Sequence, residues 1–327
     1  MAATDSSTIV AAIKALETTY MSHGIAINRS KCEWIAHQTC PPPLYFRSIP
    51  HNTFFNTTLV SIPLGNDDYR DNIMVQNVAK WDEQFDNVKN LRHAQTMLLL
   101  LRNSLQLSKV NYSIRANFAG FNSTWISRFD ARIKDTLESI LAHPITDTQW
   151  LHSQLPINKG GLGIRTAEPF TGAAYFASAM FANRKLPVIH KDITNILWIP
   201  PLEFDKAVAH YNSNSYSASN SVNIIDIHTT PSQAKLSQNI NQYIRGTFKE
   251  KAENRMKKLL AATSSRHSSD YLKTLPNIFT KSHFGNNEFR SILKYRIGQD
   301  ETTDSKCHGG NACQDTMDQH GDHALDA

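Results

Sequence analysis

The sequence has no hydrophobic run long enough to cross a membrane. Its longest apolar candidate, Met97 to Leu101, is far shorter than the roughly 18 residues that a membrane helix needs. The first residues, MAATDSSTIV, also lack the charged and apolar segments of a secretory signal. We therefore expect an intracellular protein, in the nucleus or the cytoplasm, with no membrane partner.

Cysteine is scarce as well. Four cysteines in 327 residues are too few for a disulfide framework, which indicates a reducing compartment. Two of them, Cys307 and Cys313, lie in a histidine-rich tail, and this composition favours metal binding over a disulfide. The charge excess is small, because a formal net charge of +5 permits a polyanionic partner without requiring one.

Helical patterning is the main feature that is present. With 40% hydrophobic and 19% charged residues, the chain can bury one large core or two smaller ones. Apolar residues recur at helical spacing in residues 8–21, across most of 67–186, and in 232–262. Strand-like runs occupy residues 24–28, GIAIN, and 57–65, TTLVSIPLG. The expected fold class is mainly α, with a small α/β part at the N-terminus.

These patterns divide the chain into five parts. Residues 1–66 form the α/β part, and 67–186 form a helical bundle that contains a glycine cluster at 160–163. Residues 187–230 include the Ser- and Asn-rich stretch YNSNSYSASNSVN, which is too polar to pack, so we expect an irregular linker there. A helical region, 231–298, and a Cys/His tail, 299–327, follow.

Six motifs in a fixed order carry a resemblance to a known family. They are HGIAINRSKCEW, IPLGNDDY, ITDTQWLHSQLPINKGGLGIRTAEPFTGAAYFAS, PSQAKLS, EFRSILKYRIG and CQDTMDQHGDHAL. In this order they resemble reverse-transcriptase-like proteins of eukaryotic mobile elements, of the non-LTR type, from the turn after the catalytic aspartates onwards. The resemblance runs from about Ile9 to Ala327. It implies the end of a palm domain, a helical thumb-like bundle and a small Cys/His zinc knuckle.

The chain departs from this family at the polymerase centre. Such enzymes hold two magnesium ions with a pair of carboxylates, and the ions activate the primer hydroxyl. The pair should lie just before the first helix, where the sequence has only Asp5. Asp67 and Asp68 follow Gly65-Asn66 at a helix start, where carboxylates stabilise free N–H groups. We therefore expect no catalytic residue, and magnesium only if a partner supplies the missing polymerase portion.

Lys31 lies in the turn after the first strand-like run. The resemblance implies that a lysine there is close to the departing pyrophosphate and can donate a proton to it. Without the carboxylates, the favoured interpretation of Lys31 is a solvated lysine of the turn, and its role as a general acid is then only vestigial.

Basic residues of the helical parts are candidates for contact with a nucleic-acid backbone, as in polymerase thumbs. An ordinary solvated helix face is the alternative. The glycine cluster beside Lys159 either approaches a phosphate closely or forms a tight turn. Residues 245–258 hold six basic residues against two acidic ones. The candidates are Arg102, Lys109, Arg115, Lys159, Lys257 and Lys258, and the same helices carry Arg92, Arg128, Arg132 and Lys134.

The tail KCHGGNACQDTMDQHGDHALDA is the sharpest chemical feature. Tetrahedral zinc takes four Cys or His ligands, and Cys307, Cys313, His320 and His323 supply four within this short segment. In the family resembled, a cysteine follows the last histidine by four residues, where this chain has Ala327. His308 is an alternative fourth ligand, and a tail without metal is the competing interpretation. The expected ligands are Cys307, Cys313, His320 and His323, with zinc as the cofactor.

Three functions fit these features. The first is a truncated RNA-directed DNA polymerase of a mobile element, which keeps nucleic-acid binding but cannot polymerise alone. The second is a non-enzymatic, zinc-containing DNA- or RNA-binding protein derived from such an element. The third, an intact enzyme of another class, needs a catalytic constellation that the sequence does not offer.

Overall fold

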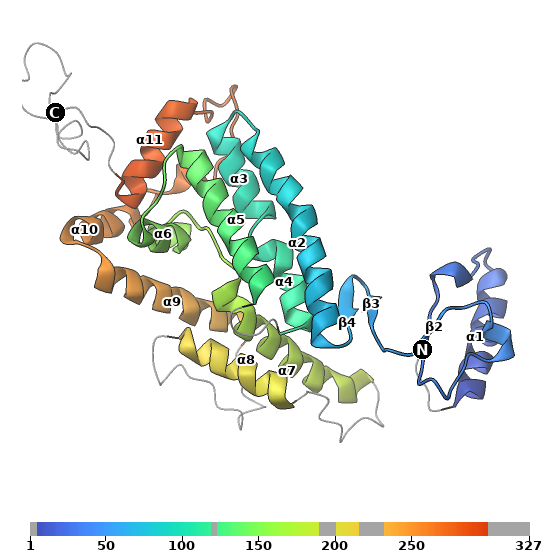
Figure 1. Ribbon diagram of the computed structural model, residues 1–327. Helices are drawn as coiled ribbons and strands as arrows, with labels where there is room; N and C mark the ends of the chain where they lie inside the picture. The colour runs from blue at the N-terminus through green and yellow to red at the C-terminus, as the bar shows by residue number, and fades with distance from the viewer. Residues whose placement is uncertain (1–4, 119–122, 190–200, 216–231, 300–327) are drawn as a thin grey trace, which may run out of the picture. The chain divides into compact units, whose positions relative to one another are not determined.

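The computed structural model describes residues 5–118, 123–189, 201–215 and 232–299, and the chain divides into two compact units, 1–77 and 78–327 (Figure 1). Within the described residues the chain is mainly helical, which confirms the predicted fold class, and a small part near the N-terminus carries short strands. The described helices include none that combines the length and apolar character of a membrane span.

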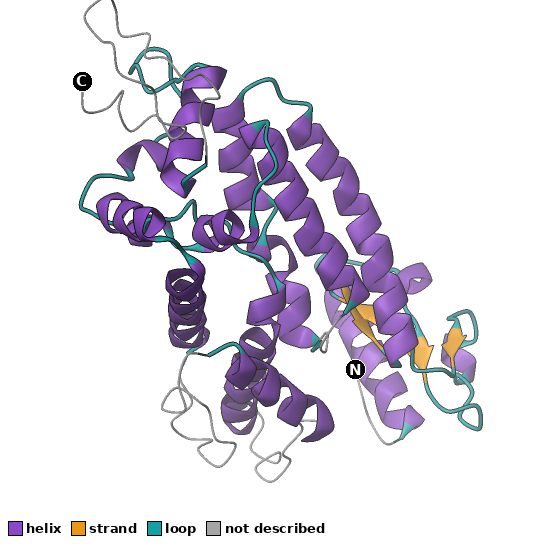
Figure 2. Ribbon diagram, turned by 60° about the vertical axis from the view of Figure 1, so that its left-hand side comes forward, coloured by secondary structure: helices purple, strands orange, loops and turns teal. Residues whose placement is uncertain are grey.

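The first unit begins with a helix and continues through short strands. Helix α1 (Ser6–Met21) is capped by Asp5, whose carboxylate accepts the Ser7 N–H, and none of its residues is buried. Among the described residues, strands occur only in this unit (Figure 2). Two pairs form: β1 (Trp34–Ile35) runs parallel to β2 (His51–Asn52), and β3 (Thr57–Leu59) runs antiparallel to β4 (Ile62–Leu64).

The strand-like runs are only partly realised in the structure. Residues 57–65 fold back into the β3–β4 hairpin, with Val60 and Ser61 at positive φ in its turn. Residues 24–28 form no strand, and Ile25 is 57% exposed. The prediction for 24–28 was wrong because alternation alone does not provide a neighbouring strand to take the backbone hydrogen bonds.

Helix α2 (Asp67–Lys89) starts in the first unit, and the second unit consists of helices in its described residues. In that unit α2, α3 and α5 lie side by side (Figure 1), and Phe85 of α2 packs edge to face on Phe129 of α5 at 5.7 Å. The helices after α2 are α3 (Ala94–Ser104), α4 (Leu107–Ala116), α5 (Thr124–Leu141), α6 (Asp147–Gln154), α7 (Thr171–Ile189), α8 (Pro201–Ser213), α9 (Gln233–Lys251), α10 (Asn254–Thr263) and α11 (Asn286–Ile297).

Helix α8 lies inside residues 187–230, where irregular structure was expected. Its apolar residues Phe204, Ala207, Val208 and Tyr211 recur at helical spacing and are all buried. The helix packs closely on α7, since a Cβ atom on Gly172 would lie 2.4 Å from the Ala207 carbonyl oxygen. The expectation failed because the polar stretch that begins at Tyr211 hid the apolar face just before it.

Candidate nucleic-acid interface

The turn that contains Lys31 is fixed by its neighbour Arg29. The Arg29 guanidinium donates to Glu17 of α1, with Nη2 2.9 Å from Oε1, and to the Tyr45 carbonyl oxygen at 3.1 Å. It also lies 4.5 Å from the centre of the Tyr45 ring. Hydrogen bonds from Tyr45 and Arg29 lower the pKa of Glu17. Lys31 itself is exposed, and its side chain contacts no acidic group among the described residues, so this turn has a structural basis that does not involve Lys31.

The carboxylate pair Asp67-Asp68 occupies the first turn of α2, the helix start that the sequence predicted. Asn66 caps this helix, because its Oδ1 accepts the Tyr69 N–H at 2.8 Å. Negative charge in a first turn is stabilised by the helix dipole. Within the described ranges, no three His, Cys, Asp or Glu side chains are grouped to hold a metal ion.

The basic residues of α5 are paired with acids. Arg128 and Arg132 both bind Asp82 of α2, with Arg132 Nε 3.1 Å from Oδ1, and Arg132 also binds Asp86. The hydrogen bond from Arg132 is the main reason that the pKa of Asp86 is lowered. Lys134 lies 4.0 Å from Asp147. A phosphate would have to compete with these carboxylates, so this helix face is a poor polyanion surface.

The three other candidates on α3 and α4 differ from one another. Arg102 is half-buried and donates from Nη1 to the Leu272 carbonyl oxygen at 2.7 Å, and burial lowers its pKa. Lys109 lies 5.9 Å from the ring centre of Trp81. Arg115, in the last turn of α4, is exposed. Of the three, Arg115 is the most available to a phosphate, and Arg102 the least.

The glycine cluster forms a tight turn that packs on α10. Gly160 and Gly163 have φ of +93° and +72°, which glycine adopts without strain. A Cβ atom on Gly161 would lie 2.1 Å from the Leu155 carbonyl oxygen. The glycines are therefore required by the turn itself, the second of the two predicted interpretations. Lys159, at the end of the short 3-10 helix before them, is exposed.

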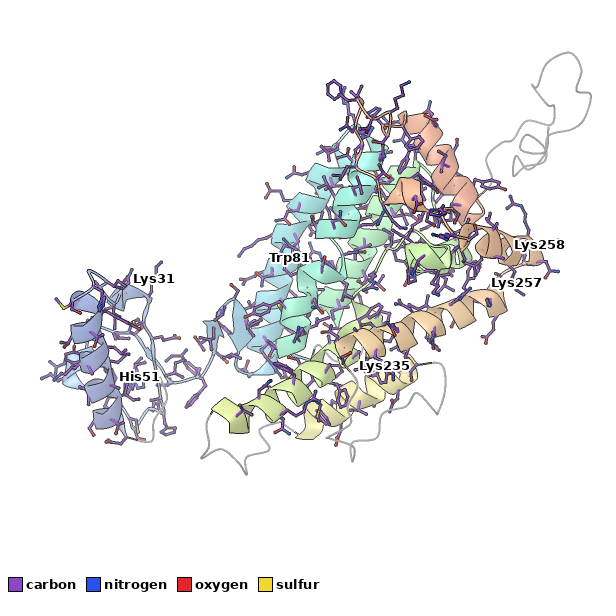
Figure 3. The ribbon with its side chains drawn as sticks, turned by 180° about the vertical axis from the view of Figure 1, so that it is seen from behind. Lys31, His51, Trp81, Lys235, Lys257 and Lys258 are labelled. Atoms are coloured by element: carbon purple, nitrogen blue, oxygen red, sulfur yellow. The ribbon has the colours of Figure 1, made fainter. Side chains whose placement is uncertain are left out.

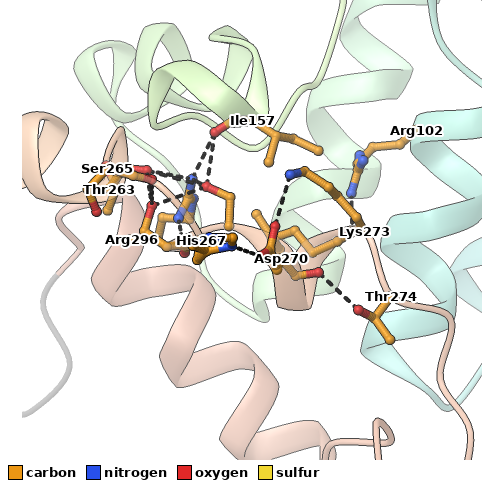
Figure 4. Close-up of polar contacts among 12 residues, drawn as sticks. Arg102, Ile157, Thr263, Ser265, His267, Asp270, Lys273, Thr274 and Arg296 are labelled. Atoms are coloured by element: carbon orange, nitrogen blue, oxygen red, sulfur yellow. Dashed lines mark hydrogen bonds and ion pairs between the residues drawn. The ribbon is translucent and has the colours of Figure 1, made fainter.

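A buried arginine that no sequence motif pointed to joins this turn to the C-terminal helices. Arg296 of α11 is 2% exposed. Its guanidinium donates to the carbonyl oxygens of Gly161 and Ile157 in the turn, each at 3.2 Å, and to those of Thr263 and Ser268 beyond it. Figure 4 shows Arg296 with Ile157 and Thr263. Its Nη2 also donates to Ser269 Oγ at 2.7 Å. One side chain thus fixes the turn, the end of α10 and the start of the next loop.

His152 of α6 lies close to this junction and is fully buried, with its ring centre 4.8 Å from that of Phe248. Burial, and then the positive charge of Arg296, lower the pKa of His152 to about 4. The imidazole is therefore neutral at physiological pH, as a core residue should be.

Lys257 and Lys258 project from the outer side of α10, while Leu259 and Leu260 of the same helix face the core (Figure 3). Neither lysine forms an ion pair with any described residue. The turn of Lys159 packs on the end of α10, because a Cβ atom on Gly160 would lie 2.7 Å from Thr263 Oγ1, so Lys159 is next to the helix that carries Lys257 and Lys258. We name these three residues the α10 lysine group.

The expected zinc ligands Cys307, Cys313, His320 and His323 lie outside the described residues, so zinc binding stays a prediction. Compared with known proteins, the chain matches no protein-family model, no curated sequence and no solved structure.

Proposed function

We propose that the chain is a nucleic-acid-binding part of a reverse-transcriptase-like protein of a mobile element, without a polymerase centre of its own. The observation that supports binding is the α10 lysine group: three exposed lysines, free of acidic partners in the described structure, on a junction that Arg296 holds rigid. Lysine contacts with phosphates release counterions and give binding that is strong at low salt. The order of the six sequence motifs supports the family.

A second function is a non-enzymatic, zinc-containing DNA- or RNA-binding protein derived from such an element. The Cys/His tail supports it, because a closed site with four ligands orders a segment without providing an open position for chemistry. Both functions share nucleic-acid binding. They differ in whether a partner that supplies the catalytic carboxylates restores polymerisation.

The binding test uses the full chain and a labelled single strand of about 20 nucleotides, with affinity measured against salt. Replacing Lys257 and Lys258 together with alanine should lower the slope of log affinity against log salt by roughly one unit per lost contact. The matched control, Arg128→Ala with Lys134→Ala, removes the same charge from paired positions and should change the slope less. Absence of binding at low salt, or an equal loss in the control, would refute the proposal.

The catalytic part of the proposal has its own test. The chain alone should extend no primer on an RNA or DNA template with magnesium or manganese, because the carboxylate pair is missing from the expected position. Incorporation that persists in Asp5→Ala and in Asp67→Ala/Asp68→Ala would show that a metal centre lies elsewhere.

A further inference from the structure

A short loop before α11 exposes three large apolar side chains. Leu275 is 70% exposed, Ile278 76% and Phe279 97%. We call residues 275–281 the Phe279 loop. Three large apolar side chains exposed within five residues form an apolar group, and exposed apolar groups of this kind mark sites of interaction.

The loop is held in one conformation by its own hydrogen bonds. Asn277 Oδ1 accepts the Phe279 N–H at 2.8 Å, and the Ser282 N–H donates to the Asn277 carbonyl oxygen at 3.0 Å. Ser282 Oγ donates to the Leu275 carbonyl oxygen at 2.8 Å. The aromatic ring is therefore presented by an ordered turn, which reduces the entropy lost when it binds a ligand.

The base of the loop is anchored to the start of α3. Gln95 is buried, donates from Nε2 to the Ser282 carbonyl oxygen at 3.0 Å, and accepts the Phe284 N–H at 3.2 Å. Next to it the rings of His93 and His283 stack with centres 4.3 Å apart. Two segments almost 190 residues apart in sequence thus fix where the Phe279 loop projects.

The loop itself carries positive charge and no negative charge. Residues 271–287 contain two lysines and no carboxylate. Lys273 is paired with Asp270 at 3.1 Å, whereas Lys281 is exposed without an ion pair in the described structure. Arg92, just before α3, is also exposed. A second copy of this tip would bring Lys281 against Lys281, so the charge disfavours self-association and favours a polyanion.

We infer that Phe279 stacks on an unpaired base of a single-stranded nucleic acid while Lys281 contacts the adjacent phosphate. Every base has an aromatic face, so such stacking tolerates any sequence, and paired bases inside a duplex are not accessible to it. The inference rests on the proposed function and adds a preference for single strands. Helix α11 begins near the base of this loop, and its 12 residues span about 18 Å. Gly298, directly after the helix, packs on Met256 and Leu259 of α10, the helix that carries Lys257 and Lys258.

The experiment compares the full chain with Phe279→Ala, Phe279→Leu and Phe279→Trp, using a single strand of mixed sequence and a blunt duplex of the same sequence. Phe279→Ala should weaken single-strand binding about tenfold and leave duplex binding unchanged. Phe279→Leu keeps apolar area without a ring and should behave like alanine, and Phe279→Trp should bind as well as the wild type. The side chain is exposed, so all three variants should unfold at the same temperature as the wild type.

Each contrary result has a distinct meaning. If the wild type binds no nucleic acid, the proposed function itself fails. If the wild type binds but Phe279→Ala binds equally well, or Phe279→Leu retains full affinity, the stacking inference is wrong. Loss of anionic-vesicle binding, or of a concentration-dependent dimer, in Phe279→Ala with unchanged nucleic-acid affinity would assign the loop to a membrane or a second copy and overturn the inference.

Discussion

Replacing His152 with glutamine should change how the stability of the second unit depends on pH. The folded state holds the pKa of His152 at about 4, mainly because the ring is buried, whereas an unfolded histidine titrates near its ordinary value of 6.5. Its contribution to stability is therefore complete above 6.5 and is lost as the pH falls towards 4. Lowering the pH from about 7.5 to 5 should therefore reduce the free energy of unfolding by about 2 kcal/mol through His152.

Asp130 of α5 acts in the opposite direction. Its two carboxylate oxygens accept the N–H groups of Ala167 and Glu168, at 2.6 and 2.9 Å, and so hold the turn before α7. Burial outweighs these hydrogen bonds and raises the pKa of Asp130 to about 7. A raised carboxyl pKa contributes stability at low pH that is lost as the pH rises through 7. Lowering the pH from about 7.5 to 5 should therefore raise the free energy of unfolding by up to about 2 kcal/mol. Asp130 is partly exposed, so solvent screening reduces this gain.

The two groups should nearly cancel in the wild type, so the variants reveal them. From neutral pH to pH 5, His152→Gln should gain about 2 kcal/mol relative to the wild type, and Asp130→Asn should lose up to about 2 kcal/mol. Urea unfolding followed by circular dichroism at several pH values measures the slope, which is independent of any constant cost of the substitution. Parallel slopes in all three proteins would refute both assignments.

Three further predictions follow from the glycine turn and the tail. Gly161→Ala should lower the free energy of unfolding in urea by about 1–3 kcal/mol, because its Cβ atom would meet the Leu155 carbonyl oxygen. As the control, Gly285→Ala should lower it far less, since no atom lies within 3.9 Å of the added Cβ. Equal losses in the two variants would show that the turn shifts to accept the Cβ. Metal analysis should find about one zinc per chain, abolished by Cys307→Ser, with His320→Ala and His308→Ala identifying the fourth ligand; a protein purified without chelator and free of zinc would contradict the site. Residues 300–327 hold seven acidic residues and one basic residue, which leaves a formal charge of +11 on the rest of the chain. Deleting this segment should therefore tighten nucleic-acid binding at low salt. An unchanged affinity would exclude competition between the tail and the nucleic acid.

The sequence pattern predicts the structure correctly where local residues decide it. The helix at residues 8–21 and the role of Asp67-Asp68 at a helix start follow from spacing and capping alone. It failed where partners are distant in the chain. Arg296 in EFRSILKYRIG looks like one more basic residue of an amphipathic helix, and only the folded chain brings the carbonyls of Ile157 and Gly161 to it. Pairing of Arg132 with Asp82 is hidden for the same reason.

Counting positive charges along the chain therefore gives the wrong surface, because the fold uses its arginines and lysines differently. Arg29, Arg132 and Arg296 each bind several oxygen atoms, as a rigid planar guanidinium can. The exposed groups without acidic partners in the described structure are chiefly lysines, among them the α10 lysine group and Lys281, although Arg47, Arg92, Arg115, Arg184 and Arg266 are also exposed without such a partner. An ammonium ion contacts phosphate as a point charge and does not read base edges in a fixed bidentate geometry. Binding through such lysines and one aromatic ring should depend on salt and on strand exposure, and it should be indifferent to base sequence.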